Sequence, residues 1–166
     1  MSITRFFFLF SFSLLLLPSA LSFAVAKPSN TFQCRAVYIS DGDSFTCLSG
    51  NNKRIKVRLL GIDAPENGQA YANKAKQQLV NLIHQQPVTL KIDGIDQYSR
   101  RLATVYDSRQ RNVNLLMVES GYAWAYRFYK KDQQYQTAQQ LAKIKKSGLW
   151  QDKNPQEPYL WRKARR

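Results

Sequence analysis

Acidic residues are scarce in this chain. Its 166 residues include 11 Asp and Glu against 25 Lys and Arg, which gives a formal net charge of +14. A charge of this size on a small chain favours polyanionic partners, either nucleic acid or an anionic membrane surface. The alternative is that the positive charge serves only solubility. Because acids are so few, any place where carboxylates cluster beside arginines is informative.

The chain also lacks an apolar run that would span a bilayer comfortably. Its most apolar stretch, Phe6–Leu17, reads FFFLFSFSLLLL, whereas a membrane-spanning helix needs about 20 apolar residues. Arg5 precedes this stretch, and residues 24–26 (AVA) follow it in the A-x-A form of a signal peptidase site. We expect residues 1–26 to be a signal peptide and residues 27–166 to be periplasmic or secreted. An uncleaved membrane anchor is the alternative.

Cysteine and histidine are too few for a metal site built from these residues. The chain contains Cys34, Cys47 and one histidine, His84, without any CxxC pair. Export favours thiol pairing, and the even number of residues between the cysteines is compatible with facing positions across a β-hairpin. We therefore predict a Cys34–Cys47 disulfide, with two small buried thiols as the alternative. His84 is expected to be a surface or packing residue.

Apolar periodicity predicts five strands and three helices. The strands are expected over residues 32–39, 44–48, 54–60, 88–92 and 102–106. Helical spacing from Ala72 to Ile83 predicts the first helix, and residues 112–120 predict the second, closed by Gly121. A third helix is expected after Asp132, with one apolar face formed by Tyr135, Ala138, Leu141 and Ala142.

This order of elements predicts an α+β fold within a single domain, residues 27–166. A five-stranded antiparallel barrel with about three packed helices fits it, and the oligonucleotide-binding (OB) barrel is the best-known fold of that kind. A two-layer α+β sandwich is the alternative. The folded part is expected to cover about residues 32–150, and the basic tail that ends in WRKARR (161–166) is expected to be loose.

Three short clusters carry charged residues at strand ends and in loops. They are DGD (41–43), RLLGIDAPE (58–66) and YSRR (98–101). Taken singly, they are consistent with a turn, a surface salt bridge and a solvated loop. Taken together, they match what phosphodiester cleavage requires: carboxylates to bind a hard cation and activate water, and arginines to hold phosphate oxygens.

The ordered motifs DGDS (41–44), RLLGIDAPE (58–66) and DQYSRRLA (96–103) resemble those of the staphylococcal (micrococcal) nuclease family, the thermonucleases. The resemblance continues through residues 113–125 and ends near SGLW (147–150). It implies a calcium site formed by Asp43, Asp63 and the backbone carbonyl of Ala64. That carbonyl role tolerates Ala where the best-known member has Thr.

The resemblance also assigns the catalytic side chains. Glu66 matches the general base that activates or orients water, and Arg58 and Arg100 match the arginines that bind the scissile phosphate. Tyr98 matches a tyrosine that contacts a terminal phosphate of a bound nucleotide. The implied protein is a monomeric, calcium-dependent nuclease that hydrolyses DNA and RNA and leaves 3′-phosphate ends.

Two other classes remain open from the sequence. A non-catalytic nucleic-acid-binding barrel would share the fold and the positive charge, but this chain keeps all five acidic and arginine positions of the family motif. A cationic membrane-active protein would need a basic helix with a large apolar face. Residues 139–146 are basic, but their apolar face is small, so we expect no stable membrane insertion.

Overall fold

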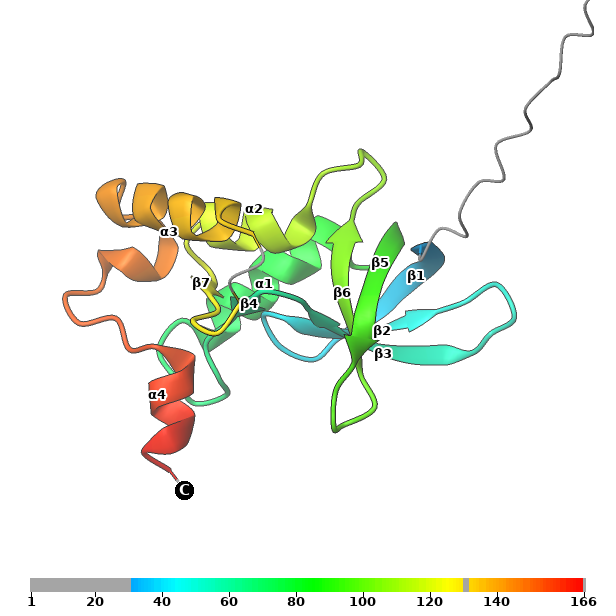
Figure 1. Ribbon diagram of the computed structural model, residues 1–166, viewed down its shortest axis with the longest axis horizontal. Coiled ribbons are helices and arrows are strands. Elements are labelled where there is room, and N and C mark those ends of the chain that lie inside the picture. The colour runs from blue at the N-terminus through cyan, green and yellow to red at the C-terminus, as the bar shows by residue number, and fades with distance from the viewer. Residues whose placement is uncertain (1–30, 130–131, 166) are drawn as a thin grey trace, which may run out of the picture.

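The computed structural model describes residues 31–129 and 132–165 (Figure 1). The expected signal peptide lies outside this part of the chain. In the described part, no helix combines the length and apolar character needed to cross a bilayer. In chain order the elements are β1 (Thr31–Ile39), β2 (Ser44–Leu48), β3 (Arg54–Leu59), β4 (Ile62–Asp63), α1 (Ala72–Ile83), β5 (Pro87–Ile95), β6 (Arg101–Tyr106), α2 (Val113–Glu119), β7 (Trp124–Ala125), α3 (Gln134–Ile144), the 3₁₀ helix η1 (Gly148–Gln151) and α4 (Pro158–Lys163).

Five strands close into a barrel in the order β1-β2-β3-β6-β5, because β1 pairs with both β2 and β5. This confirms the predicted α+β barrel and contradicts the two-layer sandwich. Four of the barrel pairings are antiparallel, but β3 and β6 run parallel, with Val57 opposite Arg101. The prediction of an all-antiparallel barrel was therefore wrong. Because α1 and β5 lie between β3 and β6 in the chain, β6 can return in the direction of β3.

Alternating strand residues fill the barrel, and one face of each long helix joins the same core. Val57 and Leu59 of β3 point inward, while the alternating Lys56 and Arg58 stay exposed and partly exposed. On α1 the buried residues are Ala72, Ala75, Leu79 and Ile83, as their spacing predicts. On α3, Tyr135, Ala138 and Ala142 are buried, but Leu141 is 51% exposed. Leu141 therefore does not share the apolar face predicted for it.

A disulfide joins Cys34 of β1 to Cys47 of β2, with the two Cα atoms 5.7 Å apart. The cysteines are not directly opposite, because Cys47 faces Ala36 across the β1–β2 pair and Cys34 faces Val88 of β5. Their positions are diagonal on one face of the sheet. The cross-link therefore lies where the chain's first strand meets both of its barrel neighbours.

Helix α2 ties the parallel strands together through one buried side chain. The Asn114 amide donates to the carbonyl oxygens of Leu60 (2.9 Å) and Ala103 (3.0 Å), and it accepts from the Val105 N–H (3.0 Å). Gly121 follows the helix with φ of +73°, so it is the predicted C′ residue. This arrangement fixes the end of β3, from which the chain enters the loop of the second motif.

The C-terminal tail is folded as far as Arg165, the last residue that the structure describes, so the prediction that the tail is loose was wrong. Pro158 begins α4, where proline is favoured at the first helical position. A helix of six residues has little stability of its own, and tertiary contacts hold it. Figure 1 shows α4 apart from the packed pair α2 and α3, beside the loop that leads from β4 to α1. Those contacts bring the tail to the charged cluster described next.

Candidate active site

The first motif forms a tight turn that presents Asp43. The carboxylate of Asp41 accepts from the Asp43 N–H at 3.0 Å, which is the hydrogen bond of an Asx turn. Asp41 therefore has the turn-forming role expected for it. Burial raises the pKa of Asp41, although Arg58, Ser44 and Arg100 oppose this shift. The Asp43 carbonyl accepts from the Leu59 N–H at 2.8 Å, so the turn is attached to β3.

The second motif places Asp63 in a two-stranded pairing that the sequence analysis missed. Asp63 ends β4 and lies opposite Trp124 of β7. Both elements are only two residues long, too short for a clear alternating pattern. The pairing leaves the Asp63 side chain almost completely buried, as is that of Asp43.

Arg58 joins the two buried aspartates. Its Nη1 donates to Asp43 Oδ1, and its Nη2 donates to Asp63 Oδ1 at 2.9 Å. The backbone N–H of Ala64 donates to the second oxygen of Asp43 at 2.7 Å. Buried carboxylates need such partners, because an isolated charge is costly to remove from water. The pairing brings the first two motifs together around one guanidinium group.

The third motif reaches the same cluster through Arg100. Its Nη1 donates to Ser44 Oγ at 3.2 Å, and that hydroxyl donates to Asp43 Oδ1 at 3.1 Å. Its Nε donates to Asp96 Oδ2 at 2.7 Å. Partial burial of Asp96 opposes ionisation, but hydrogen bonds from Arg100 and Tyr98 outweigh it and lower the pKa of Asp96. Asp96 was not among the predicted site residues, although its four-residue spacing to Arg100 was a usable signal.

Glu66 lies in the loop after β4 and is more exposed than the aspartates. Its backbone N–H donates to Gln69 Oε1 at 2.9 Å. Its carboxylate contacts Arg162 of α4, with 2.5 Å between Oε1 and Nη1. Sequence reasoning missed Arg162, because only Pro158 indicates that the basic tail contains a helix.

The charged cluster formed by Asp43, Asp63, Arg58 and Arg100 lies beside a cleft of about 670 Å³. Tyr98 is 64% exposed at its edge, and the Arg100 guanidinium lies 5.3 Å from the centre of its ring. Three aromatic side chains also line the cleft: Tyr126, Phe128 and Tyr129. The sequence-predicted residues that line it are Arg58, Glu66, Tyr98 and Arg100. Asp43 and Asp63 do not line the cleft themselves, but both pair with Arg58, which does.

The chemistry of the two aspartates suits a hard cation. Carboxylate and carbonyl oxygens are the ligands that Ca²⁺ and Mg²⁺ prefer, and Asp43 and Asp63 already converge on one positive group. Over residues 31–129 and 132–165, no three Asp, Glu, His or Cys side chains are arranged as a complete metal site. At this point in the described structure, two buried carboxylates therefore share one guanidinium partner.

Known proteins resemble the chain over most of its length. The family described as staphylococcal nuclease homologue matches residues 56–152. An uncharacterized endonuclease of Haemophilus influenzae is 51% identical over 151 residues, which cover 91% of this chain and 83% of that protein. A micrococcal nuclease of Shigella flexneri is 41% identical over 143 residues, which cover 80% of this chain and 82% of that protein. The chain therefore belongs to the staphylococcal nuclease family and is an endonuclease of the micrococcal nuclease type.

Proposed function

We propose that the chain is an exported, calcium-dependent nuclease that hydrolyses DNA and RNA and leaves 3′-phosphate ends. The observation that carries the proposal is the bridge from Arg58 to Asp43 and Asp63 beside a cleft that Glu66 and Arg100 also line. The carboxylate proposed as the base and the two arginines proposed to bind phosphate lie around this aspartate pair. We expect this enzyme to act as a monomer.

Asp43, Asp63 and the Ala64 carbonyl are the groups proposed to hold Ca²⁺, which supplies charge neutralisation at the scissile phosphate. Glu66 accepts a proton from water as the water oxygen bonds to phosphorus. Arg58 and Arg100 donate to the non-bridging oxygens, whose negative charge grows in the transition state. The bond from phosphorus to the 5′-oxygen breaks, and that oxygen takes up a proton from solvent, to which Glu66 then releases its own. The phosphate then remains on the 3′ side.

Substrate breadth follows from the kind of contact available. The cleft offers guanidinium groups and exposed rings of Tyr98 and Phe128. Guanidinium groups bind phosphate without reading sequence, and aromatic rings stack on any base. The +14 charge supports attraction of a polyanion. The Cys34–Cys47 disulfide supports export after removal of residues 1–26, because such bonds persist in oxidising compartments.

A comparison of Glu66→Gln with Glu119→Gln tests the assignment. Both changes remove one carboxylate charge, but Glu119 is exposed near the end of α2, outside the cleft. General-base catalysis contributes about 10²- to 10⁴-fold, so we expect a loss of that size in kcat for Glu66→Gln alone. Each protein is incubated with single-stranded DNA, duplex DNA and RNA in Ca²⁺, Mg²⁺ or EDTA, and the product ends are identified. Wild-type turnover by Glu66→Gln, or full activity in EDTA, contradicts the mechanism.

A further inference from the structure

Helix α4 brings a third guanidinium group, besides those of Arg58 and Arg100, to the charged cluster. Arg162 Nη1 and Nη2 donate to the two oxygens of Asp63 at 3.0 and 2.9 Å, and Nη1 also donates to Glu66 at 2.5 Å. Burial opposes the charged form of Arg162, but these hydrogen bonds outweigh it and raise its pKa. One side chain therefore holds both a proposed cation ligand and the proposed base.

With Arg162 in place, all four carboxylate oxygens of the aspartates have partners. Asp63 Oδ1 accepts from Arg58 and Arg162, and its Oδ2 accepts from Arg162. Asp43 Oδ1 accepts from Arg58 and Ser44, and its Oδ2 accepts from the Ala64 N–H. A divalent cation needs lone pairs of the same oxygens. It is also repelled by a guanidinium group that lies against them.

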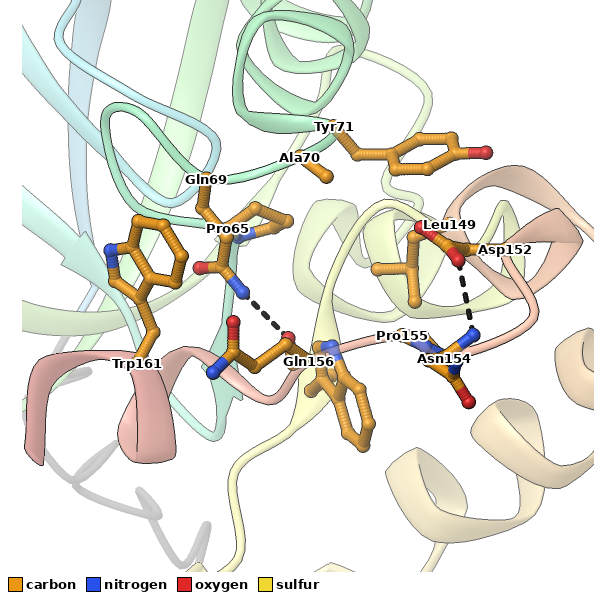
Figure 2. A pocket seen from close by; sticks show the side chains of 11 residues that line it. Pro65, Gln69, Ala70, Tyr71, Leu149, Asp152, Asn154, Pro155, Gln156 and Trp161 are labelled. Atoms are coloured by element: carbon orange, nitrogen blue, oxygen red, sulfur yellow. Dashed lines mark hydrogen bonds between the residues drawn. The ribbon is translucent and has the colours of Figure 1, made fainter. Parts of the chain in front are cut away.

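The tail that carries Arg162 is attached to the loop that carries Glu66. Figure 2 shows the Gln69 amide directed at the backbone of Gln156, to whose carbonyl it donates at 2.6 Å. The same Gln69 side chain accepts from the Glu66 N–H. Trp161, one residue before Arg162, lies beside Gln69 and Pro65 in Figure 2. The catalytic loop and the tail are thus joined at one buried side chain.

A second set of contacts holds the start of α4 against the segment that follows β7. Arg127 forms an ion pair with Glu157 at 2.8 Å, and its guanidinium lies 5.0 Å from the centre of the Tyr159 ring. Phe128 packs edge-on against the same ring at 5.2 Å between centroids. These contacts hold the start of α4 without the use of Arg162.

We propose that Arg162 is a built-in competitor for the divalent cation. Its guanidinium pairs with Asp63 and Glu66, and cation binding requires it to move into the adjoining cleft, which it already lines. That movement also frees Glu66 to accept a proton from water. Arg162 thereby sets the affinity of the site for its cation. The inference rests on the proposed calcium site, and it concerns a residue beyond the family match at 56–152.

Direct titration with Ca²⁺ in the absence of nucleic acid tests the proposal. Isothermal calorimetry is applied to the wild-type protein, Arg162→Gln and the matched control Lys163→Gln. Lys163 is exposed on the same helix, so its replacement removes the same charge without removing a carboxylate contact of Arg162. At about 0.15 M salt, charges beyond about 8 Å are largely screened. We expect the Ca²⁺ dissociation constant to fall at least tenfold in Arg162→Gln and to change less than twofold in Lys163→Gln.

Other outcomes separate this proposal from the proposed function. If the wild type and Arg162→Gln bind Ca²⁺ equally, or if Lys163→Gln matches Arg162→Gln, direct competition is wrong, and the proposed calcium site is unaffected. If none of the proteins binds Ca²⁺, both the competition and the calcium site are wrong. If Arg162→Gln does not fold, Arg162→Lys decides. It keeps the charge but loses the two-pronged contact, so tighter Ca²⁺ binding than in the wild type is expected, and unchanged affinity overturns the proposal.

Discussion

Gly42 lies so close to Ala64 that a Cβ atom at position 42 would stand 2.7 Å from the Ala64 Cβ. The same atom would stand 2.7 Å from the Cβ of Ala75 on α1. The turn of the first motif therefore packs directly against the loop of the second motif and against the helix that follows. The two motifs can approach this closely because Gly42 has no side chain and the side chains of Ala64 and Ala75 are small.

Gly42→Ala is expected to lower kcat strongly and to have only a small effect on the unfolding midpoint. The added methyl group must push the Asp41–Asp43 turn away from Ala64, and a shift of about 1 Å in a catalytic array costs about 100-fold in rate. The measurement is kcat on duplex DNA, with the unfolding midpoint determined in urea. Gly50→Ala is the control, because a Cβ there meets nothing within 4 Å. Equal activity of the two variants would show that the close contact does not position the site.

Asp96→Asn tests whether Arg100 needs its carboxylate partner. Asp96 accepts from the Arg100 N–H and Nε, and Asp107 accepts from the Arg111 N–H and Nε in the same pattern. Asp107→Asn is thus a structural twin outside the cleft. We expect kcat to fall about 10- to 100-fold in Asp96→Asn, because Arg100 loses its fixed orientation, and to stay near wild type in Asp107→Asn. A similar loss in both variants would indicate a purely structural effect.

The ion pair between Asp96 and Arg100 also gives a prediction for the pH dependence of activity. The pKa of Asp96 is lowered in the folded protein, since hydrogen bonds from Arg100 and Tyr98 outweigh partial burial. Its stabilising effect is therefore complete above the unfolded value of 3.8 and is lost as the pH falls through the lower folded value. The ratio of wild-type to Asp96→Asn activity should then stay constant between about pH 5 and 8. A ratio that changes across this range would contradict the assignment.

Asn114→Ala is expected to destabilise the barrel where the parallel strands β3 and β6 meet. The change leaves the Leu60 and Ala103 carbonyls and the Val105 N–H without their buried partner. Unpaired buried groups cost about 1–3 kcal/mol each, so a loss of about 3 kcal/mol in the free energy of unfolding is a conservative expectation. Urea denaturation measures it. Asn81→Ala, at an exposed position of α1, should cost less than about 0.5 kcal/mol.

Local patterns predicted most of the elements because strands and helices with one buried face leave a period in the sequence. Val57 and Leu59 alternate with charged residues, and Ala75 and Leu79 recur at helical spacing. The direction of β6 relative to β3 has no such local signature, since it depends on the path through α1 and β5. The same holds for Asn114, whose burial within α2 cannot be told from exposure by residue type.

The sequence motifs indicated which charged residues come together at strand ends and turns, but they did not indicate the contacts that the C-terminal helix makes with them. The motifs around Asp43, Arg58 and Asp63 lie at turns and strand ends, and the structure brings their side chains into contact. Arg162 sits in a short helix whose formation depends on partners such as Gln69 and Arg127. A basic tail with six residues of weak helical preference gives no indication of those partners.

Removal of the Cys34–Cys47 disulfide is expected to lower stability without changing chemistry. The bond closes a loop with a sequence separation of 13, for which chain-entropy arguments give about 3 kcal/mol at 25 °C. Neither cysteine lines the cleft, so kcat at 25 °C should stay within about twofold of wild type. The measurement compares urea unfolding of the oxidised protein, the reduced protein and the variant with Cys34→Ala and Cys47→Ala.

The reduced protein is the informative control in that comparison. It keeps both buried sulfur atoms, so its loss of stability reports the cross-link, whereas the double variant also loses side-chain volume from the core. We expect the reduced protein to lose about 3 kcal/mol and the double variant somewhat more. Oxidised and reduced proteins of equal stability would mean that residual structure restricts the reduced unfolded chain as much as the bond does. The link would then have no measurable part in the stability of the barrel.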